Sequence, residues 1–156
     1  MYVPDLIFLS EPQTFQADLP SVIDYFKGDY DAFLNSEDLL EPDLSHQANR
    51  TKGGNMIMWR KHLDPYISVH KPDSTSFLFV ILDIPGHKTS IHAALYLPTA
   101  GKDLEYLAAL ATLKTNIEDL QREHPGAVIY LRGDANSSNN NKSRSSLLSS
   151  FCSVSS

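Results

Sequence analysis

Two acidic residues and one amide follow apolar runs that are typical of buried β-strands. Glu11 comes directly after Leu6–Leu9, and Asp134 comes after the run 127–131, with Asn136 two residues later. Magnesium and manganese bind carboxylate oxygens and complete their coordination with water. An asparagine amide can donate a hydrogen bond to a phosphate. These residues therefore indicate a magnesium site with a phosphate donor beside it, although acidic residues after strands also begin ordinary turns.

The distance between these residues in the sequence makes the prediction depend on the fold. Ligands of α/β proteins bind beyond the carboxyl ends of strands. Glu11 and Asp134 therefore converge if their two strands are parallel neighbours in one sheet. Four basic residues around Gly53-Gly54 and the following apolar run form a second candidate site, which would contact DNA phosphates; a solvated edge is the alternative. These residues are Arg50, Lys52, Arg60 and Lys61.

The pattern of apolar residues predicts the strands and helices that position these residues. Short apolar runs, with turn signals between several of them, predict six strands, and four of the six follow one another closely, as in an antiparallel or mixed sheet. Apolar residues at helical spacing predict two helices, over 18–27 and 103–123, whereas the polar segment 35–53 reads as a long loop. The predicted strands are 6–9, 56–59, 66–70, 77–82, 91–97 and 127–131. Together these elements indicate an α/β fold.

Length, charge and cysteine content exclude several classes of protein. The 156 residues suffice for one domain, and the net charge of −6 lacks the basic surplus of an electrostatic nucleic-acid binder. A single cysteine excludes an internal disulfide and a four-cysteine zinc site. No signal peptide is visible, so we expect a protein of the nucleus or cytoplasm and not a secreted one. His87 and His92 flank a predicted strand, and we interpret them as surface or turn residues.

Four stretches of the chain, in this order, resemble motifs of the endonuclease/exonuclease/phosphatase superfamily. The first resembles its strand with a metal-binding glutamate, the second its Gly-Gly entry into a central strand, and the third its Tyr-x-Pro-Asn segment before a long helix. The fourth resembles its Gly-Asp-Phe-Asn motif. The stretches are Asp5–Glu11 (DLIFLSE), Lys52–Trp59 (KGGNMIMW), Leu95–Thr99 (LYLPT) and Tyr130–Asn136 (YLRGDAN). The endonuclease domains of non-LTR (LINE-type) retrotransposons are the most similar branch.

The resemblance implies a fold, an activity and residue roles. The fold would be a DNase-I-like sandwich of two mixed sheets with helices outside, and the activity metal-dependent phosphodiester hydrolysis, with DNA as substrate and Mg²⁺ or Mn²⁺ as cofactor. Glu11 would bind the metal, and Asp134 would orient or activate the attacking water. Asn136 would hold the phosphate, and Tyr96 would place its hydroxyl near the phosphate or the leaving group.

The sequence also departs from the superfamily pattern. It shows no earlier strand with an asparagine near the metal and no Ser-Asp-His motif, and Ala135 stands where phenylalanine is usual. We therefore interpret residues 1–140 as the central part of such a domain and 141–156 as a serine-rich truncated tail. Two alternatives stay open: a catalytically inactive fragment, and a phosphatase or RNA-directed enzyme of the same fold.

Overall fold

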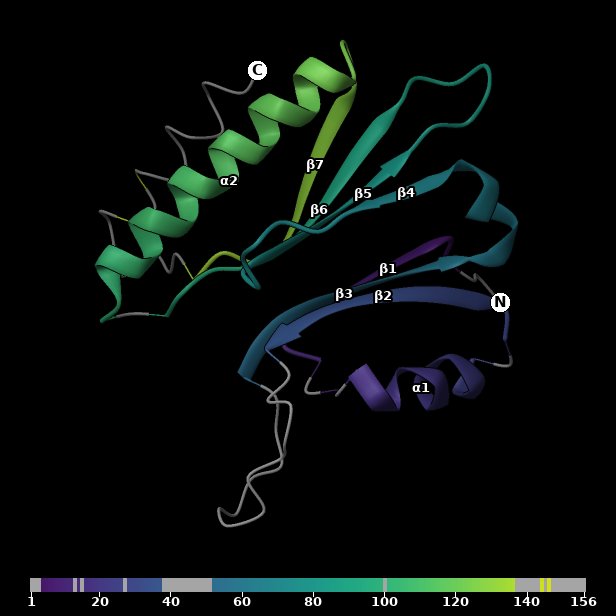
Figure 1. Cartoon of the computed structure of the whole chain (residues 1–156), viewed down its shortest axis with the longest axis horizontal. Coiled ribbons are helices and arrows are strands. Elements are labelled where there is room, and N and C mark those ends of the chain that lie inside the picture. The colour runs from purple at the N-terminus through teal and green to yellow at the C-terminus, as the bar shows by residue number, and fades with distance from the viewer. Residues whose placement is uncertain are drawn as a thin grey trace.

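The computed structural model describes residues 4–12, 14, 16–26, 28–37, 52–99, 101–136, 144 and 146. Its strands form two sheets that face each other (Figure 1). The first sheet has the order β1 (Leu6–Ser10), β3 (Lys52–Arg60), β2 (Tyr30–Glu37). The second has the order β4 (Ile67–His70), β5 (Phe77–Leu82), β6 (Ser90–Tyr96), β7 (Val128–Asp134). The helices are η1 (Gln16–Asp18), α1 (Leu19–Tyr25), η2 (Lys61–Tyr66) and α2 (Asp103–Glu123).

All strand pairs are antiparallel except β6 and β7, which run parallel with α2 as the connection between them. A parallel pair needs such a crossover, because the chain must return to the same end of the sheet before the second strand begins. Strands β6 and β7 consequently end side by side, with Tyr96 opposite Asp134. The predicted α/β sandwich with mixed pairing is confirmed, and α2 spans the predicted residues 103–123.

Three apolar clusters hold four layers together. Residues of α1, among them Leu19 and Val22, pack against Met56 and Met58 on the outer face of the first sheet. Residues of α2 pack against the outer face of the second sheet. Side chains from both sheets fill the space between them; the fully buried ones are Ile57, Leu78 and Val80. The order of layers is therefore helix, sheet, sheet, helix, as Figure 1 shows.

The strand pairing corrects the predicted loop and shows that the condition set for the convergence of Glu11 and Asp134 is not met. Residues 35–37 and 52–53, which we expected in a loop, belong to the paired strands β2 and β3, whose hydrogen bonds outweigh the polar composition of this segment. The strands before Glu11 and Asp134 are not parallel neighbours, because β1 lies in the first sheet and β7 in the second. The remaining residues of the predicted loop, 38–51, lie outside the described residues, as does the tail 137–156 apart from Arg144 and Ser146.

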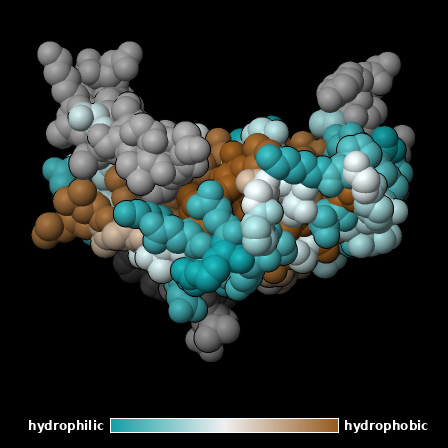
Figure 2. All heavy atoms as spheres, turned by 90° about the horizontal axis from the view of Figure 1, so that it is seen from above, coloured by the Kyte–Doolittle hydropathy of each residue, from teal (hydrophilic) through white to brown (hydrophobic). Residues whose placement is uncertain are grey.

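Figure 2 shows a face that is largely hydrophilic, with hydrophobic atoms gathered along its middle and at one end. The exposed large hydrophobic residues among those described include Leu9 of β1 and Tyr130 of β7. Each of these two strands has one edge that pairs with no other described strand. None of the described helices is both long and apolar enough to cross a membrane.

Candidate active site at the ends of β1, β6 and β7

The two facing sheets bring Glu11, Tyr96 and Asp134 to one end of the molecule. Glu11 follows β1, while Tyr96 and Asp134 end the paired strands β6 and β7. The Ser10 hydroxyl donates to the Leu95 carbonyl oxygen at 2.9 Å and thereby ties β1 to β6 across the sheets. The two carboxylates therefore come to the same end through face-to-face packing of two sheets, not through pairing of their strands in one sheet.

Glycine is required immediately before Asp134. A Cβ atom at Gly133 would lie 2.1 Å from the Leu95 carbonyl oxygen and 2.9 Å from the Ser10 hydroxyl, and its φ of +126° disfavours other residues. The close approach of β1, β6 and β7 thus explains the glycine in the Gly-Asp pair. A side chain at this position would push β7, and Asp134 with it, away from Glu11.

The Tyr96 hydroxyl lies near enough to both carboxylates to feel their charge. A hydrogen bond with Glu11, burial, and the negative charges of Glu11 and then Asp134 together raise the pKa of Tyr96 to about 12. Each of these causes favours the neutral phenol. Tyr96 is therefore a hydrogen-bond donor at neutral pH, and the site has an excess of negative charge that a divalent cation would balance.

Glu11 and Asn136 both adopt a backbone conformation with positive φ, at 49° and 47°. They are the only non-glycine residues with positive φ in the described part of the chain. The Glu11 N–H donates to the Gly54 carbonyl oxygen at 3.0 Å, and the Asn136 N–H donates to Asp134 Oδ1 at 2.8 Å. Such strain persists only where surrounding contacts enforce it, and it is concentrated at functional sites.

The Asn136 side chain is already engaged in the structure. Its Nδ2 donates to the Leu97 carbonyl oxygen at 2.6 Å, which fixes the turn after β7 against the end of β6. One hydrogen of this amide remains for another acceptor. Asn136 therefore has a positioning contact in addition to the phosphate contact that the superfamily resemblance implies.

Arg144 secures the same turn, and the sequence analysis missed it. Its side chain is only 2% exposed and lies over the Tyr106 ring, 4.2 Å from the centroid. The guanidinium donates to Asp103 Oδ1 at 2.7 Å and 3.0 Å and to the carbonyl oxygens of residues 98, 99 and 136 at 2.7, 3.0 and 3.4 Å. Arg144 thus joins the segment after β6, the start of α2 and Asn136. The sequence feature that could have indicated this role is that Arg144 is the one arginine in a serine-rich segment without acidic residues.

Two buried asparagines in the first sheet were also missed. Asn35 Nδ2 donates to the carbonyl oxygens of Ser74 at 2.9 Å and Phe77 at 3.0 Å, and Asn55 Nδ2 donates to Thr75 at 3.0 Å. Both side chains are at most 1% exposed. They bind the segment between β4 and β5 to the first sheet at the Glu11 end, because Asn55 pairs with Ser10. Asparagine side chains inside strands indicate buried hydrogen bonds, but the partners of these two lie more than 15 residues away in the sequence and could not be identified from it.

The predicted basic residues do not form one cluster. Arg60 and Lys61 lie at the end of β3 that is remote from Glu11, about 17 Å along the strand from Asn55 at 3.4 Å per residue. Lys52 begins β3, so its backbone is at the Glu11 end, but its side chain is outside the described residues, as is all of Arg50. The nine-residue length of β3 separates the backbone of Lys52 from that of Arg60.

His92 is a core residue and not the surface or turn residue that we expected. It is 7% exposed, lies opposite Tyr130 in β7, and stacks on that ring with centroids 4.9 Å apart. Burial, and then the positive charge of Arg132, lower the pKa of His92 to about 4. The imidazole is therefore neutral at physiological pH and serves packing between the sheets.

The described side chains suit a hard divalent cation held by few protein ligands. No group of three or more histidine, cysteine, aspartate or glutamate residues gathers among them. Glu11 and Asp134, which share Tyr96 as a neighbour, supply carboxylate oxygens. Magnesium typically binds to one or two carboxylates and keeps several waters, so this donor set fits it.

Known structures share this fold. The chain superposes on the catalytic domain of human Nocturnin with a TM-score of 0.61 at 13% identity, covering 95% of this chain and 57% of that one. For ANGEL2, a 2′,3′-cyclic phosphatase, the TM-score is 0.57 at 16% identity, with coverages of 92% and 42%. For an endonuclease/exonuclease/phosphatase protein of Beutenbergia cavernae it is 0.51 at 18% identity, with coverages of 95% and 45%.

The chain spans about half the length of the solved structures that it matches. No protein-family model and no curated protein sequence matches it. At these levels of identity the likeness shows the fold alone, which is the DNase-I-like sandwich of the endonuclease/exonuclease/phosphatase proteins.

Proposed function

We propose that this chain, which has the fold of the endonuclease/exonuclease/phosphatase proteins, carries the central part of a metal-dependent phosphodiesterase site. The observation that supports this most directly is that the Tyr96 hydroxyl hydrogen-bonds with Glu11 and lies within range of the charge of Asp134. On the basis of the four sequence motifs, we propose that the specific activity is DNA cleavage by an endonuclease domain of retroelement origin. Glu11, Tyr96, Asp134 and Asn136 are the proposed site residues, and Arg50 and Lys52 are proposed contacts to the nucleic acid.

Glu11, with Asp134 nearby, would hold Mg²⁺ or Mn²⁺. When bound, the ion would supply positive charge against the charge that builds on the phosphoryl oxygens. The 49° φ of Glu11 and its N–H bond to Gly54 fix the direction in which the carboxylate leaves the strand. A preorganised ligand needs no rearrangement when the cation binds, which favours affinity.

Asp134 is the residue that we propose to act on the attacking water. Its Oδ1 accepts the Asn136 N–H, and none of the described residues donates to its other oxygen. That second oxygen is the proposed acceptor of the proton from the attacking water. A positioned base of this kind contributes about 10² to 10⁴ in rate.

Tyr96 and Asn136 are the proposed hydrogen-bond donors to the phosphate. The Tyr96 phenol keeps its proton at neutral pH because its pKa is about 12. Asn136 has one amide hydrogen beyond the one that it gives to Leu97. Donors fixed before the substrate arrives stabilise developing charge without reorganisation.

Metal binding gives a test that does not depend on turnover. In the ¹⁵N-labelled chain, Mn²⁺ should broaden the amide signals of residues 11, 96 and 134 first, and Glu11→Gln should weaken this effect at least tenfold. Glu118→Gln is the matched control, because Glu118 is exposed on α2 and pairs only with Lys114 at 3.7 Å. Equal broadening in both variants would refute the assignment of Glu11.

Nicking of supercoiled plasmid DNA with Mg²⁺ tests the activity itself. Asp134→Asn should lose at least about 100-fold in rate, whereas Asp119→Asn on α2 should retain it. Metal binding without nicking would favour the alternative of an inactive fragment. Hydrolysis of phosphomonoesters or RNA without DNA nicking would favour a phosphatase or an RNA-directed enzyme. The similarity in fold to ANGEL2 is the observation that supports the phosphatase alternative.

A further inference from the structure

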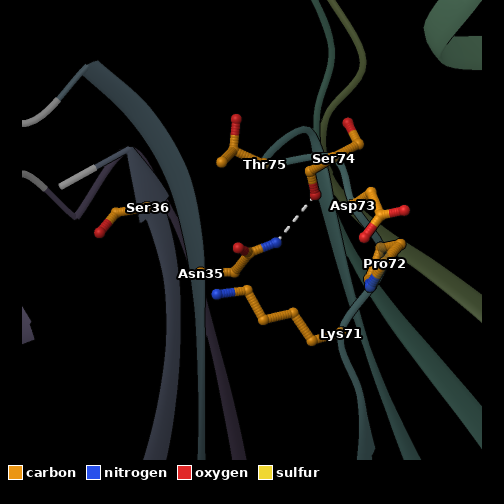
Figure 3. A pocket seen from close by; sticks show the side chains of 7 residues that line it. All are labelled: Asn35, Ser36, Lys71, Pro72, Asp73, Ser74 and Thr75. Atoms are coloured by element: carbon orange, nitrogen blue, oxygen red, sulfur yellow. Dashed lines mark hydrogen bonds between the residues drawn. The ribbon is translucent and has the colours of Figure 1, made fainter.

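A polar pocket of about 240 Å³ opens at the same end of the sandwich as the candidate active site. Residues 35–36 at the end of β2 form one wall, and residues 71–75 between β4 and β5 form the other (Figure 3). Asn35 and Ser10 both pair with Asn55 of β3. The pocket therefore lies two strands along the first sheet from Glu11.

The pocket is connected rigidly to the active-site strands. Buried Asn35 donates to two carbonyl oxygens of the 74–77 segment, and Asn55 donates to a third. In the same segment, the Ser76 carbonyl oxygen accepts the backbone N–H of Tyr96 at 2.8 Å. One short segment thus forms the pocket wall and positions Tyr96, so the distance between the two sites is fixed by the fold.

The chemistry of the pocket favours an anion. The Lys71 side chain reaches across it, with the ammonium beside Asn35, whereas the Asp73 carboxylate points away from both (Figure 3). Among the described residues Lys71 has no ion-pair partner. Ser36, Ser74 and Thr75, together with Pro72, complete the lining. A lysine ammonium and hydroxyl groups are typical contacts to a nucleic-acid phosphate.

We propose that this pocket binds a backbone phosphate of a nucleic-acid strand, away from the phosphodiester that is cleaved. The inference rests on the proposed function for the position of the cleaved bond. It assigns the substrate class, because a second phosphate at a fixed distance exists in a polynucleotide and not in a small phosphate monoester. Lys71 becomes a substrate-binding residue that contributes affinity without reading the base sequence.

Binding measured without catalysis separates this inference from the proposed function. Fluorescence anisotropy of a fluorescein-labelled 12-base-pair DNA duplex, in EDTA and at several KCl concentrations, gives Kd and its salt dependence. Lys71→Gln should weaken binding about tenfold and reduce the slope of log K against log salt by about one, as expected for one lost phosphate contact. Lys88→Gln is the matched control, because Lys88 lies in the β5–β6 turn at the opposite end of the second sheet, and it should change Kd less than twofold.

The outcomes are distinguishable. A selective loss of affinity and salt slope in Lys71→Gln supports the phosphate site even if the chain cleaves no DNA, in which case only the proposed hydrolysis fails. Equal Kd values and slopes for Lys71→Gln and Lys88→Gln would overturn the inference, even if cleavage is intact. Absence of duplex binding by the unaltered chain would overturn it as well.

Discussion

Arg144 should be among the most important single side chains for the stability of the candidate active site. The change Arg144→Met removes the guanidinium and keeps much of the aliphatic stem. Among the described residues it deletes five hydrogen bonds, two to Asp103 and three to backbone carbonyl oxygens, together with the contact to the Tyr106 ring. The segment after β6, the start of α2 and the turn at Asn136 would lose their common partner.

The expected cost is about 3 kcal/mol in the free energy of unfolding. Asp103 is 74% exposed, so water can replace its lost contact and the ion pair itself contributes little. The three carbonyl oxygens lose a charged donor at about 1.5 kcal/mol each. The cation–π contact adds about 1 kcal/mol. Relief from burying a guanidinium offsets part of this sum.

Urea unfolding followed by the fluorescence of Trp59, the only tryptophan, measures this cost. In thermal unfolding the same loss should lower Tm by about 6 to 12 °C. Arg122→Met is the matched control, because Arg122 is 75% exposed and pairs only with Asp119, and it should change stability by less than about 0.5 kcal/mol. Arg144→Lys should recover less than half of the loss, since an ammonium cannot reproduce the planar fork of donors. Equal urea midpoints for Arg144→Met and Arg122→Met would refute the reasoning.

Three further predictions follow from the structure. Glu11→Gln should lower the pKa of Tyr96 from about 12 toward 10, because the carboxylate that accepts the phenol hydrogen is lost. The ¹³Cζ signal of Tyr96 measures this pKa, and an unchanged value would show that Glu11 does not contact Tyr96. The lowered pKa of His92 means that stability is full above pH 6.5 and falls as pH decreases toward 4, by about 2 kcal/mol between pH 8 and pH 5. Urea midpoints at the two pH values should show this fall, and His92→Phe should reduce it by that amount. Gly133→Ala should cost about 3 kcal/mol or more, because its Cβ would overlap Leu95, whereas Gly126→Ala meets no atom within 4 Å and should cost about 1 kcal/mol; equal thermal shifts would contradict the close packing at Gly133.

The elements could be predicted from the sequence because their signals are local. The apolar run 77–82 matches β5, and the helical spacing over 103–123 matches α2. Side chains face the same side every two residues in a strand and every 3.6 residues in a helix, so a short stretch of apolar residues is enough to indicate the element. β2 was missed because its polar residues break that local pattern, and its main stabilisation comes from pairing with β3.

The chemistry of the candidate site could be predicted from residue types, but its assembly could not. Glu11 and Asp134 were recognisable as acidic residues after strands. Whether they converge depends on which sheet holds each strand, and the sequence left this as a condition. The pairings that decide this join residues more than 35 positions apart, and apolar runs of similar composition can exchange partners without changing the local pattern.

The sequence by itself determined the positions of both α-helices and of every described strand except β2, and the acidic and amide groups at the strand ends. Only the tertiary structure decided the hydrogen-bond partners of the buried side chains of Asn35, Asn55 and Arg144. A polar group is stable in the interior only when it finds a hydrogen-bond partner there, and these partners come from distant segments. Their positions are set by the packing of the two sheets and α2 as a whole, which no local stretch of sequence encodes.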